Sequence, residues 1–253
     1  MPHRCRDCRK FFSVKTGTVM QNSKLGYRVW AVAIYLMANH PKGMSSVQLH
    51  KELGITQKTA WFLAHRIREG WKLQTPMQHF IGPVEADETY VGGLEKNKHA
   101  KKKARKGPIG TKTPVVGMKD RFSNHVYARV MPDGVTMDSV YDFLSEKLHG
   151  RAKLYTDESR VYTNAHHYHK KVCHSRGEFV RGDVHTNGLE SFWSMLKRAH
   201  KGTFHYMSPK HLQRYADEFA WKHNVRKMSI RTQMQKVARS LEGKILTWKK
   251  LTK

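Results

Sequence analysis

Residues 84–93 read Val84-Glu-Ala-Asp-Glu-Thr-Tyr-Val-Gly-Gly93 and decide the fold of the larger part of the chain. Side chains alternate between the two faces of a β-strand, so this stretch predicts a strand with Glu85, Asp87 and Thr89 on one face. The chain has only 20 acidic residues against 47 Lys and Arg, which makes the position of each acid informative. Asp87, at the centre of this strand, is either a charge at the edge of a sheet or a member of a site.

Two more acidic residues lie on predicted secondary-structure elements. Asp157 closes the short strand Lys153-Leu-Tyr-Thr-Asp157, and Glu190 lies in the first turn of a helix that starts at Gly188. Carboxylates on one strand, on a later parallel neighbour and on a following helix are what a two-Mg²⁺ phosphoryl-transfer site needs. Hard cations take oxygen ligands, and two of them about 4 Å apart activate the attacking oxygen and stabilise the leaving one.

Asp157 and Glu190 also have simpler interpretations. Asp157 fits an ordinary turn, and Asn187-Gly-Leu-Glu190 fits a capping box with Glu at the third helical position. The capping and metal-binding roles of Glu190 can coexist, because the helix has two faces of different character. Its buried stripe is predicted to be Leu189, Phe192, Trp193 and Leu196, and its second face Glu190, Ser194, Lys197 and Lys201. A lysine two turns after a metal ligand suits a phosphate contact.

The remaining pattern of the second half mixes strands and helices. Residues 114–130 predict two strands joined at 120–124, and we also expect a helix over 139–148, strands over 152–156 and 178–184, and a helix over 208–224. The basic stretch 95–107 predicts a loop or flap; it is either a solvated charged loop or, as we expect, a contact to DNA phosphates through Lys101, Lys102 and Lys103.

The first part of the chain is predicted to be helical, with a domain boundary near residue 76. After a helix over 28–37, helices over 46–53 and 57–71 have helix-turn-helix lengths, with Thr56 as a possible N-cap. Gln57 and Lys58 then lie in the first turn of a recognition helix, where base edges are contacted. An ordinary helical hairpin with a solvated basic face is the alternative. Residues 227–253 predict a basic helical tail.

Cys5 and Cys8 have the Cys-x2-Cys spacing of half a zinc ribbon. A tetrahedral zinc site needs a second such pair, and Cys173 stands alone in the sequence. The pair is therefore either half of a zinc site or two thiols without metal, so zinc is a doubtful cofactor.

Composition limits the class of function. The net charge of +27 attracts polyanions, and 39% hydrophobic residues exceed what a disordered basic tail contains. Three cysteines fit a reducing compartment, and neither a secretory signal nor a run of about 20 apolar residues is present. We therefore expect a cytoplasmic, nucleoid-associated protein with DNA as its partner and no membrane contact.

Several long strings resemble the DDE transposases of bacterial insertion sequences, and more narrowly the ISXO-type group related to Merlin elements. The resemblance runs over residues 4–226 and is strongest in three stretches: Val84–Gly93, Leu154-Tyr-Thr-Asp-Glu158 and His185-Thr-Asn-Gly-Leu-Glu-Ser-Phe-Trp-Ser-Met-Leu-Lys-Arg198. It implies an α/β fold in which a helix-turn-helix domain (23–75) precedes an RNase H-like catalytic domain with a mixed sheet (76–226), after half a zinc ribbon (1–22). The family normally has an earlier Cys-x2-Cys pair, so we expect either a start upstream or a truncated copy.

The resemblance also implies a reaction. Asp87, Asp157 and Glu190 would hold Mg²⁺ or Mn²⁺, and Lys197 would contact DNA near the transposon end. The enzyme would cut DNA at the ends of the element and transfer the strands to target DNA, as an oligomer that holds two ends. The alternatives are a helix-turn-helix regulator without catalysis, a nuclease of the same fold, and an inactive copy.

Overall fold

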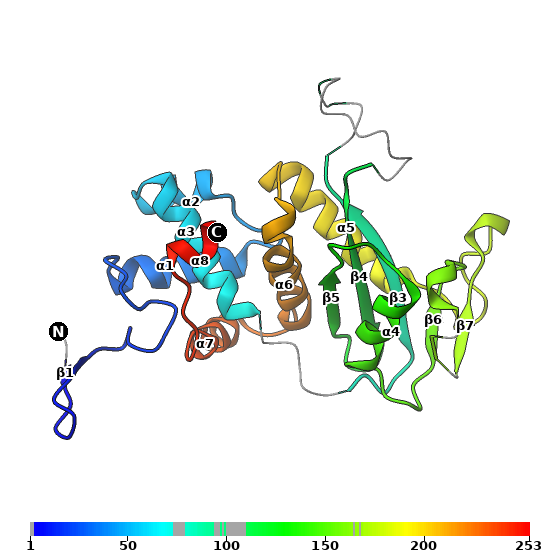
Figure 1. Cartoon of the computed structure of the whole chain (residues 1–253), viewed down its shortest axis with the longest axis horizontal. Coiled ribbons are helices and arrows are strands. Elements are labelled where there is room, and N and C mark those ends of the chain that lie inside the picture. The colour runs from blue at the N-terminus through cyan, green and yellow to red at the C-terminus, as the bar shows by residue number, and fades with distance from the viewer. Residues whose placement is uncertain are drawn as a thin grey trace. The chain divides into compact units, whose positions relative to one another are not determined.

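The stretch that opens the sequence analysis forms β3 (Val84–Val91), the central strand of a five-stranded mixed sheet (Figure 1). The computed structural model describes residues 3–72, 79–93, 97, 99, 110–163, 165–166 and 168–253. The strand order is β5-β4-β3-β6-β7. Strands β3, β4 (Thr113–Asp120) and β5 (Val126–Val130) are antiparallel, whereas β6 (Leu154–Thr156) and β7 (His169–Lys171) run parallel to β3. This is the mixed sheet expected of an RNase H-like fold.

Helices cover both faces of this sheet, as the alternation of its strands requires. On one face, α4 (Met137–Ser145) packs through Val140 and Phe143 against the side chains that include Val84 and Ala86. On the other face, α5 (Asn187–Ala199) and α6 (Pro209–Val225) pack against the side of the sheet that contains Val115. Shorter helical turns lie at 160–162 and 174–176, and a π-helical turn at 200–204 joins α5 to α6. Glu85, Asp87 and Thr89 share the α5 face of β3.

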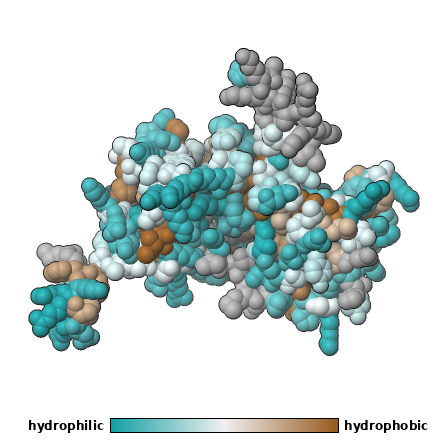
Figure 2. All heavy atoms as spheres, in the orientation of Figure 1, coloured by the Kyte–Doolittle hydropathy of each residue, from teal (hydrophilic) through white to brown (hydrophobic). Residues whose placement is uncertain are grey.

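The chain divides into two units, of which Thr75–Asn224 contains the sheet. The other unit consists of Met1–Gln74 and Val225–Lys253. It contains a hairpin of β1 (His3–Arg4) and β2 (Phe11–Phe12) and the helices α1 (Tyr27–Asn39), α2 (Ser46–Leu53), α3 (Gln57–Trp71), α7 (Ile230–Ser240) and α8 (Trp248–Thr252). Hydrophilic side chains occupy most of the surface in Figure 2, in keeping with the net charge of +27.

The two helices predicted for a helix-turn-helix are present, with local signals at their ends. Gly54 ends α2 in the left-handed conformation, at φ 62°, and the Thr56 hydroxyl accepts the backbone N–H of Thr59 as the N-cap of α3. Four small or apolar residues at helical spacing form a buried stripe on α3: Ala60, Leu63, Ala64 and Ile67. His65 and Arg68 are buried too, so α3 exposes little beyond its first turn.

Two predictions about other segments are corrected. Residues 227–253 are not a separate basic tail: α7 packs against α1 and α3, and Arg66 Nε donates to the carbonyl of Leu246 at 3.3 Å. Residues 178–184 form no strand but only an isolated bridge between Arg181 and Val184. The outer strand of the sheet is β7 instead, which no sequence pattern predicted. None of the helices in the described ranges combines the length and apolarity that crossing a bilayer requires.

Candidate active site

Asp87 and Asp157 lie at the same level of two neighbouring parallel strands. Val84 is opposite Leu154 and Glu85 is opposite Tyr155 in the β3–β6 ladder. Two residues further along each segment are Asp87, on β3, and Asp157, which directly follows β6; the two are close enough for the charge of Asp157 to act on Asp87. Adjacent strands are about 4.8 Å apart, and residues at matching positions point to the same face. The sheet therefore brings together two of the three acids that the sequence singled out.

The electrostatics of this pair support their closeness. Burial, then the negative charges of Asp157 and Glu88, raise the pKa of Asp87 to about 7. Burial also raises the pKa of Asp157. Because the charge of Asp157 opposes ionisation of Asp87, Asp157 ionises first and Asp87 keeps its proton to near neutral pH in the absence of a cation.

Trp193 connects the helix α5 to this pair. Its indole Nε1 donates a hydrogen bond of 3.0 Å to Asp87 Oδ2, which partly offsets the rise in the Asp87 pKa. The buried stripe predicted for α5 is confirmed, since Leu189, Phe192, Trp193 and Leu196 are all buried. This stripe sets the helix against β3 with Trp193 at the level of Asp87.

Glu190 lies one turn before Trp193 but does not join the two aspartates in this structure. Its side chain is exposed and its Oε1 accepts a hydrogen bond of 3.1 Å from the Thr186 hydroxyl. No group of three or more His, Cys, Asp or Glu side chains placed to hold a metal ion occurs among the described residues. The predicted capping box is also not formed. Helix α5 begins at Asn187, and the hydroxyl of its N-cap residue, Thr186, accepts no backbone N–H of the helix.

More acidic side chains surround Asp157. Glu88, on the α4 face of β3, is largely buried, and burial followed by the charge of Asp157 raises its pKa. The Tyr162 hydroxyl is close to Glu88, yet neither this hydroxyl nor Glu88 Oε2 has a well-formed hydrogen bond. Glu158 is held by the backbone N–H groups of His174 at 2.5 Å and Ser175 at 2.9 Å. Negative charge is thus concentrated at one end of β3 and β6.

This donor set fits a divalent cation. Asp87 and Asp157 offer oxygen ligands on one face, and burial is the main cause that raises the pKa of each carboxyl, followed for Asp87 by the charge of Asp157. A third carboxylate is available from Glu190, one helical turn from a side chain that contacts Asp87. Three carboxylates with room for water match the preference of Mg²⁺ and Mn²⁺.

The residues predicted to contact DNA have different surroundings. Lys197 is exposed on α5, on the same side as Glu190 because seven residues are close to two helical turns. In the other unit, Gln57 and Lys58 are exposed, but Gln57 Nε2 donates to Ser46 Oγ at 2.8 Å, and Lys58 Nζ lies 4.8 Å from the centre of the Trp248 ring. Lys101, Lys102 and Lys103 fall outside the described residues.

Cys5 and Cys8 lie on the short N-terminal hairpin, in which the Cys5 N–H donates to the Lys10 carbonyl at 2.9 Å. Hydrogen bonds from the backbone amides of Cys8 and Asp7, and from the Cys8 side chain, lower the pKa of the Cys5 thiol. Within the described part of the chain, no third ligand stands with this pair. Cys173 is remote in sequence and contacts Ser175 Oγ at 3.3 Å.

Glu85 and Arg121 are residues of the site region to which sequence reasoning gave no role. Glu85 is 1% exposed and forms an ion pair with Arg121 at 2.8 Å. Alternation had placed Glu85 on the Asp87 face, and a carboxylate in that position needs a cation when it is buried. The partner follows β4 in the turn to β5, and no pattern in the sequence identifies it.

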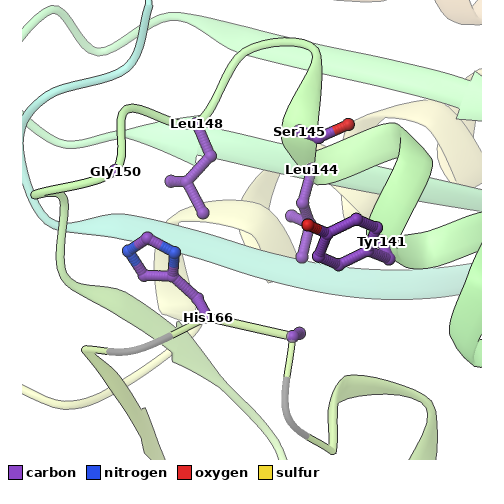
Figure 3. Close-up of a pocket in the computed structure, with 7 residues that line it drawn as sticks. Tyr141, Leu144, Ser145, Leu148, Gly150 and His166 are labelled. Atoms are coloured by element: carbon purple, nitrogen blue, oxygen red, sulfur yellow. The ribbon is translucent and has the colours of Figure 1, made fainter.

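A pocket of about 730 Å³ lies elsewhere, beside α4 (Figure 3). Tyr141, Leu144 and Ser145 come from α4, and Leu148 and His166 from the segments that follow. Because α4 packs on the opposite face of the sheet from α5, this pocket is separate from the acids.

Comparisons with known proteins show what the chain is similar to. An uncharacterized protein in transposable element ISH50 of Halobacterium salinarum is 29% identical over 207 residues, which cover 77% of this chain and 69% of that protein. Among solved structures, the Mos1 transposase paired-end complex with left transposon end matches at 12% identity and a TM-score of 0.31, over 83% of this chain and 78% of that one.

A chain of the simian T-cell lymphotropic virus intasome in complex with PP2A regulatory subunit B56 gamma matches at 14% identity and a TM-score of 0.34. This match covers 76% of the present chain and 65% of the other, just under two thirds of its length. The family model of the ISXO2-like transposase domain matches residues 80–224. Since this match spans more than half of the 253 residues, the chain belongs to the ISXO2-like transposases of insertion-sequence elements.

Proposed function

We propose that the protein cuts DNA at the ends of its insertion sequence and transfers the freed strands to target DNA in a metal-dependent reaction. The observation that supports the proposal is the position of Asp87 on β3 and of Asp157 directly after the neighbouring parallel strand β6, together with the pKa of Asp87, which burial and then the charge of Asp157 raise to about 7. Two carboxylates with no cation between them oppose each other's ionisation. Such a pair is a costly arrangement that a metal site justifies.

In this proposal Asp87, Asp157 and Glu190 hold Mg²⁺ or Mn²⁺. When bound, the metal supplies activation of the attacking oxygen and charge stabilisation of the leaving one. Asp87 must give up the proton that it keeps near neutral pH, and Glu190 must exchange its bond to Thr186 for a position beside the aspartates. The indole of Trp193 donates to Asp87 Oδ2, so Oδ1 is the Asp87 oxygen that accepts no hydrogen bond from this indole.

Basic residues provide the affinity for DNA. Lys197, two turns after Glu190 on the same side of α5, is in place to contact a phosphate next to the one that reacts. The net charge of +27 adds sequence-independent attraction, and the first turn of α3, with Gln57 and Lys58, is the part of the helix-turn-helix left open to base edges. Because strand transfer joins two ends, we expect an oligomer on DNA.

The test is a nicking and strand-transfer assay on a labelled DNA duplex that carries one end of the element, with and without Mg²⁺. The wild-type protein is compared with Asp87→Asn, Asp157→Asn and Glu190→Gln, and the affinity of each for the same DNA is measured by gel shift. We expect each substitution to abolish nicking while DNA affinity stays equal or rises, because a negative charge is removed. Nicking by Glu190→Gln at the wild-type rate would refute the proposed triad.

The same assay separates the alternatives. A helix-turn-helix regulator would bind the end but release no nicked product at any metal concentration. A hydrolytic nuclease of this fold would produce nicks but no joined product when target DNA is added. An inactive copy would bind DNA and Mn²⁺ but would release neither nicked nor joined product.

A further inference from the structure

Glu85 is a buried carboxylate whose two oxygens face two different elements. Its Oε1 accepts a hydrogen bond of 2.8 Å from Arg121 Nε, and its Oε2 accepts one of 3.0 Å from the backbone N–H of Leu189. Leu189 lies in the first turn of α5, and its N–H is shared between Glu85 Oε2 and the Thr186 carbonyl, which is also at 3.0 Å. The Thr186 hydroxyl does not cap this turn, so Glu85 on β3 provides a side-chain acceptor for the start of α5 from outside the helix.

Arg121 extends the connection to the segment that leads into α5. Its Nη1 donates to the Asp183 carbonyl at 2.6 Å, and its Nη2 donates to the His185 carbonyl at 2.9 Å. Nη2 also lies 2.8 Å from His185 Nδ1. A guanidinium only donates, so Nδ1 is the acceptor and the ring is neutral. The guanidinium stacks over the ring of Tyr155 at 4.9 Å.

The packing at this point leaves little freedom. A Cβ atom on Gly188 would lie 2.7 Å from Glu85 Oε2 and 2.5 Å from Lys119 Nζ, so any other residue at this position would require these two side chains to shift. Glu85 is two residues from Asp87 on the same face of β3, and Leu189 is adjacent to Glu190. The bonds of Glu85 therefore span the strand that contains one proposed ligand and the helical turn that contains another.

We propose that Glu85 and Arg121 are positioning residues that fix the first turn of α5, and with it Glu190, relative to Asp87 and Asp157. This inference rests on the proposed function. An ion pair of this kind is a poor way to gain stability alone, since well-packed apolar residues of the same volume often serve as well. Directional bonds to a guanidinium fork and a backbone N–H do what apolar packing does not: they fix the position of the helix along and around its axis.

The test compares full-length wild-type protein with Glu85→Gln. Both oxygens of Glu85 accept from N–H donors, so a Gln amide would set its NH₂ group against one of them and loosen the contact. We expect Glu85→Gln to bind Mn²⁺ about tenfold more weakly, measured without DNA from the free Mn²⁺ signal in electron paramagnetic resonance. Nicking should recover at high Mn²⁺ concentration, since all three proposed ligands remain, and DNA affinity should stay within twofold of wild type.

Glu218→Gln is the matched control. Glu218 is also a fully buried carboxylate, which accepts from Lys222 Nζ at 2.6 Å within α6 and has no part in the proposed site. Both this variant and Glu85→Gln should have a lower melting temperature than wild type, yet Glu218→Gln should bind Mn²⁺ like wild type. Arg121→Lys is a second test in case Glu85→Gln fails to fold: it keeps the charge beside Glu85, removes the fork to residues 183–185, and should also weaken Mn²⁺ binding.

Three results would overturn the inference, and they can be told apart. A folded Glu85→Gln protein with wild-type Mn²⁺ affinity would refute it while leaving the proposed function intact. An equal loss of Mn²⁺ binding in Glu218→Gln would show a general effect of instability. Equal Mn²⁺ affinities of the wild-type protein and Asp87→Asn would refute the proposed metal site, and the positioning role with it.

Discussion

Trp193 Nε1 donates a hydrogen bond of 3.0 Å to Asp87 Oδ2, and so connects α5 to β3 across 106 residues of sequence. The indole reaches Asp87 because Gly117, opposite Asp87 on β4, has no side chain. A Cβ atom there would lie 2.6 Å from Trp193 Cζ2. The atom in conflict belongs to a buried ring, which has no room to move aside. Asp87, Gly117 and Trp193 therefore form one structural unit of the site.

We expect Gly117→Ala to destabilise the protein by about 1–3 kcal/mol, the usual range for adding a methyl group to a packed interior. The substitution pushes the indole away from Asp87, so nicking should fall as well. Urea unfolding gives the change in stability. Gly150→Ala is the control, because nothing lies within 4 Å of a Cβ atom there, and its change should be within about 0.5 kcal/mol. Equal unfolding midpoints for the two variants would contradict the prediction.

The raised pKa of Asp87 predicts a pH dependence of stability in metal-free protein. In the unfolded chain this carboxyl ionises near pH 3.8, whereas in the folded protein it ionises near pH 7. Between these values the folded state binds the extra proton, so stability falls as pH rises from about 4 to about 7. A pKa difference of this size corresponds to at most about 4 kcal/mol.

Asp87→Asn removes this titration. With a chelator present, the variant should be more stable than wild type at pH 8, and the advantage should shrink towards pH 4, as followed by thermal melting. Mg²⁺ should stabilise the wild-type protein at pH 8 and leave the variant unchanged. A wild-type advantage at pH 8 without metal would mean that Asp87 is not destabilised by its surroundings.

Lys197→Ala should weaken binding to the end of the element while Mn²⁺ binding remains at the wild-type level. Removing one phosphate contact reduces the slope of log affinity against log salt by about 0.9. The difference between variant and wild type should therefore be largest at low salt, although the variant itself binds more tightly there. Lys210→Ala removes an exposed lysine of α6 and is the control for charge alone. Gel shifts at several salt concentrations distinguish the two variants. Identical curves of affinity against salt for Lys197→Ala and Lys210→Ala would exclude a specific role for Lys197.

Replacing Lys101, Lys102 and Lys103 together with Gln should lower the affinity for all DNA sequences alike. Contacts to phosphates contain no sequence information, so the ratio of specific to non-specific affinity should stay constant while the salt slope becomes shallower. Competition gel shifts with end DNA and unrelated DNA of equal length measure this ratio. A loss confined to the end DNA would instead indicate that this stretch contacts bases.

Local patterns in the sequence determined most of the elements around the site. Alternation predicted the strand Val84–Val91, apolar spacing predicted the buried stripe of α5, and Thr56 marked the start of α3. These features depend on residues a few positions apart, which share one face or one turn. The same strings carried the resemblance to the transposase family, which the family match confirmed.

Contacts between distant parts of the chain were decided only by the tertiary structure. Strand β7 is three polar or basic residues, and it forms because β6 supplies backbone partners for it whatever its side chains are. The segment after α7 packs against α3 and does not extend outward as a tail, since Leu241 packs next to Gly70 and the Trp248 ring meets the Trp61 ring edge-on at 5.6 Å. The sequence placed Glu85 on the Asp87 face, but only folding brought Arg121 and the start of α5 to it. A buried charge depends on partners that local periodicity does not record.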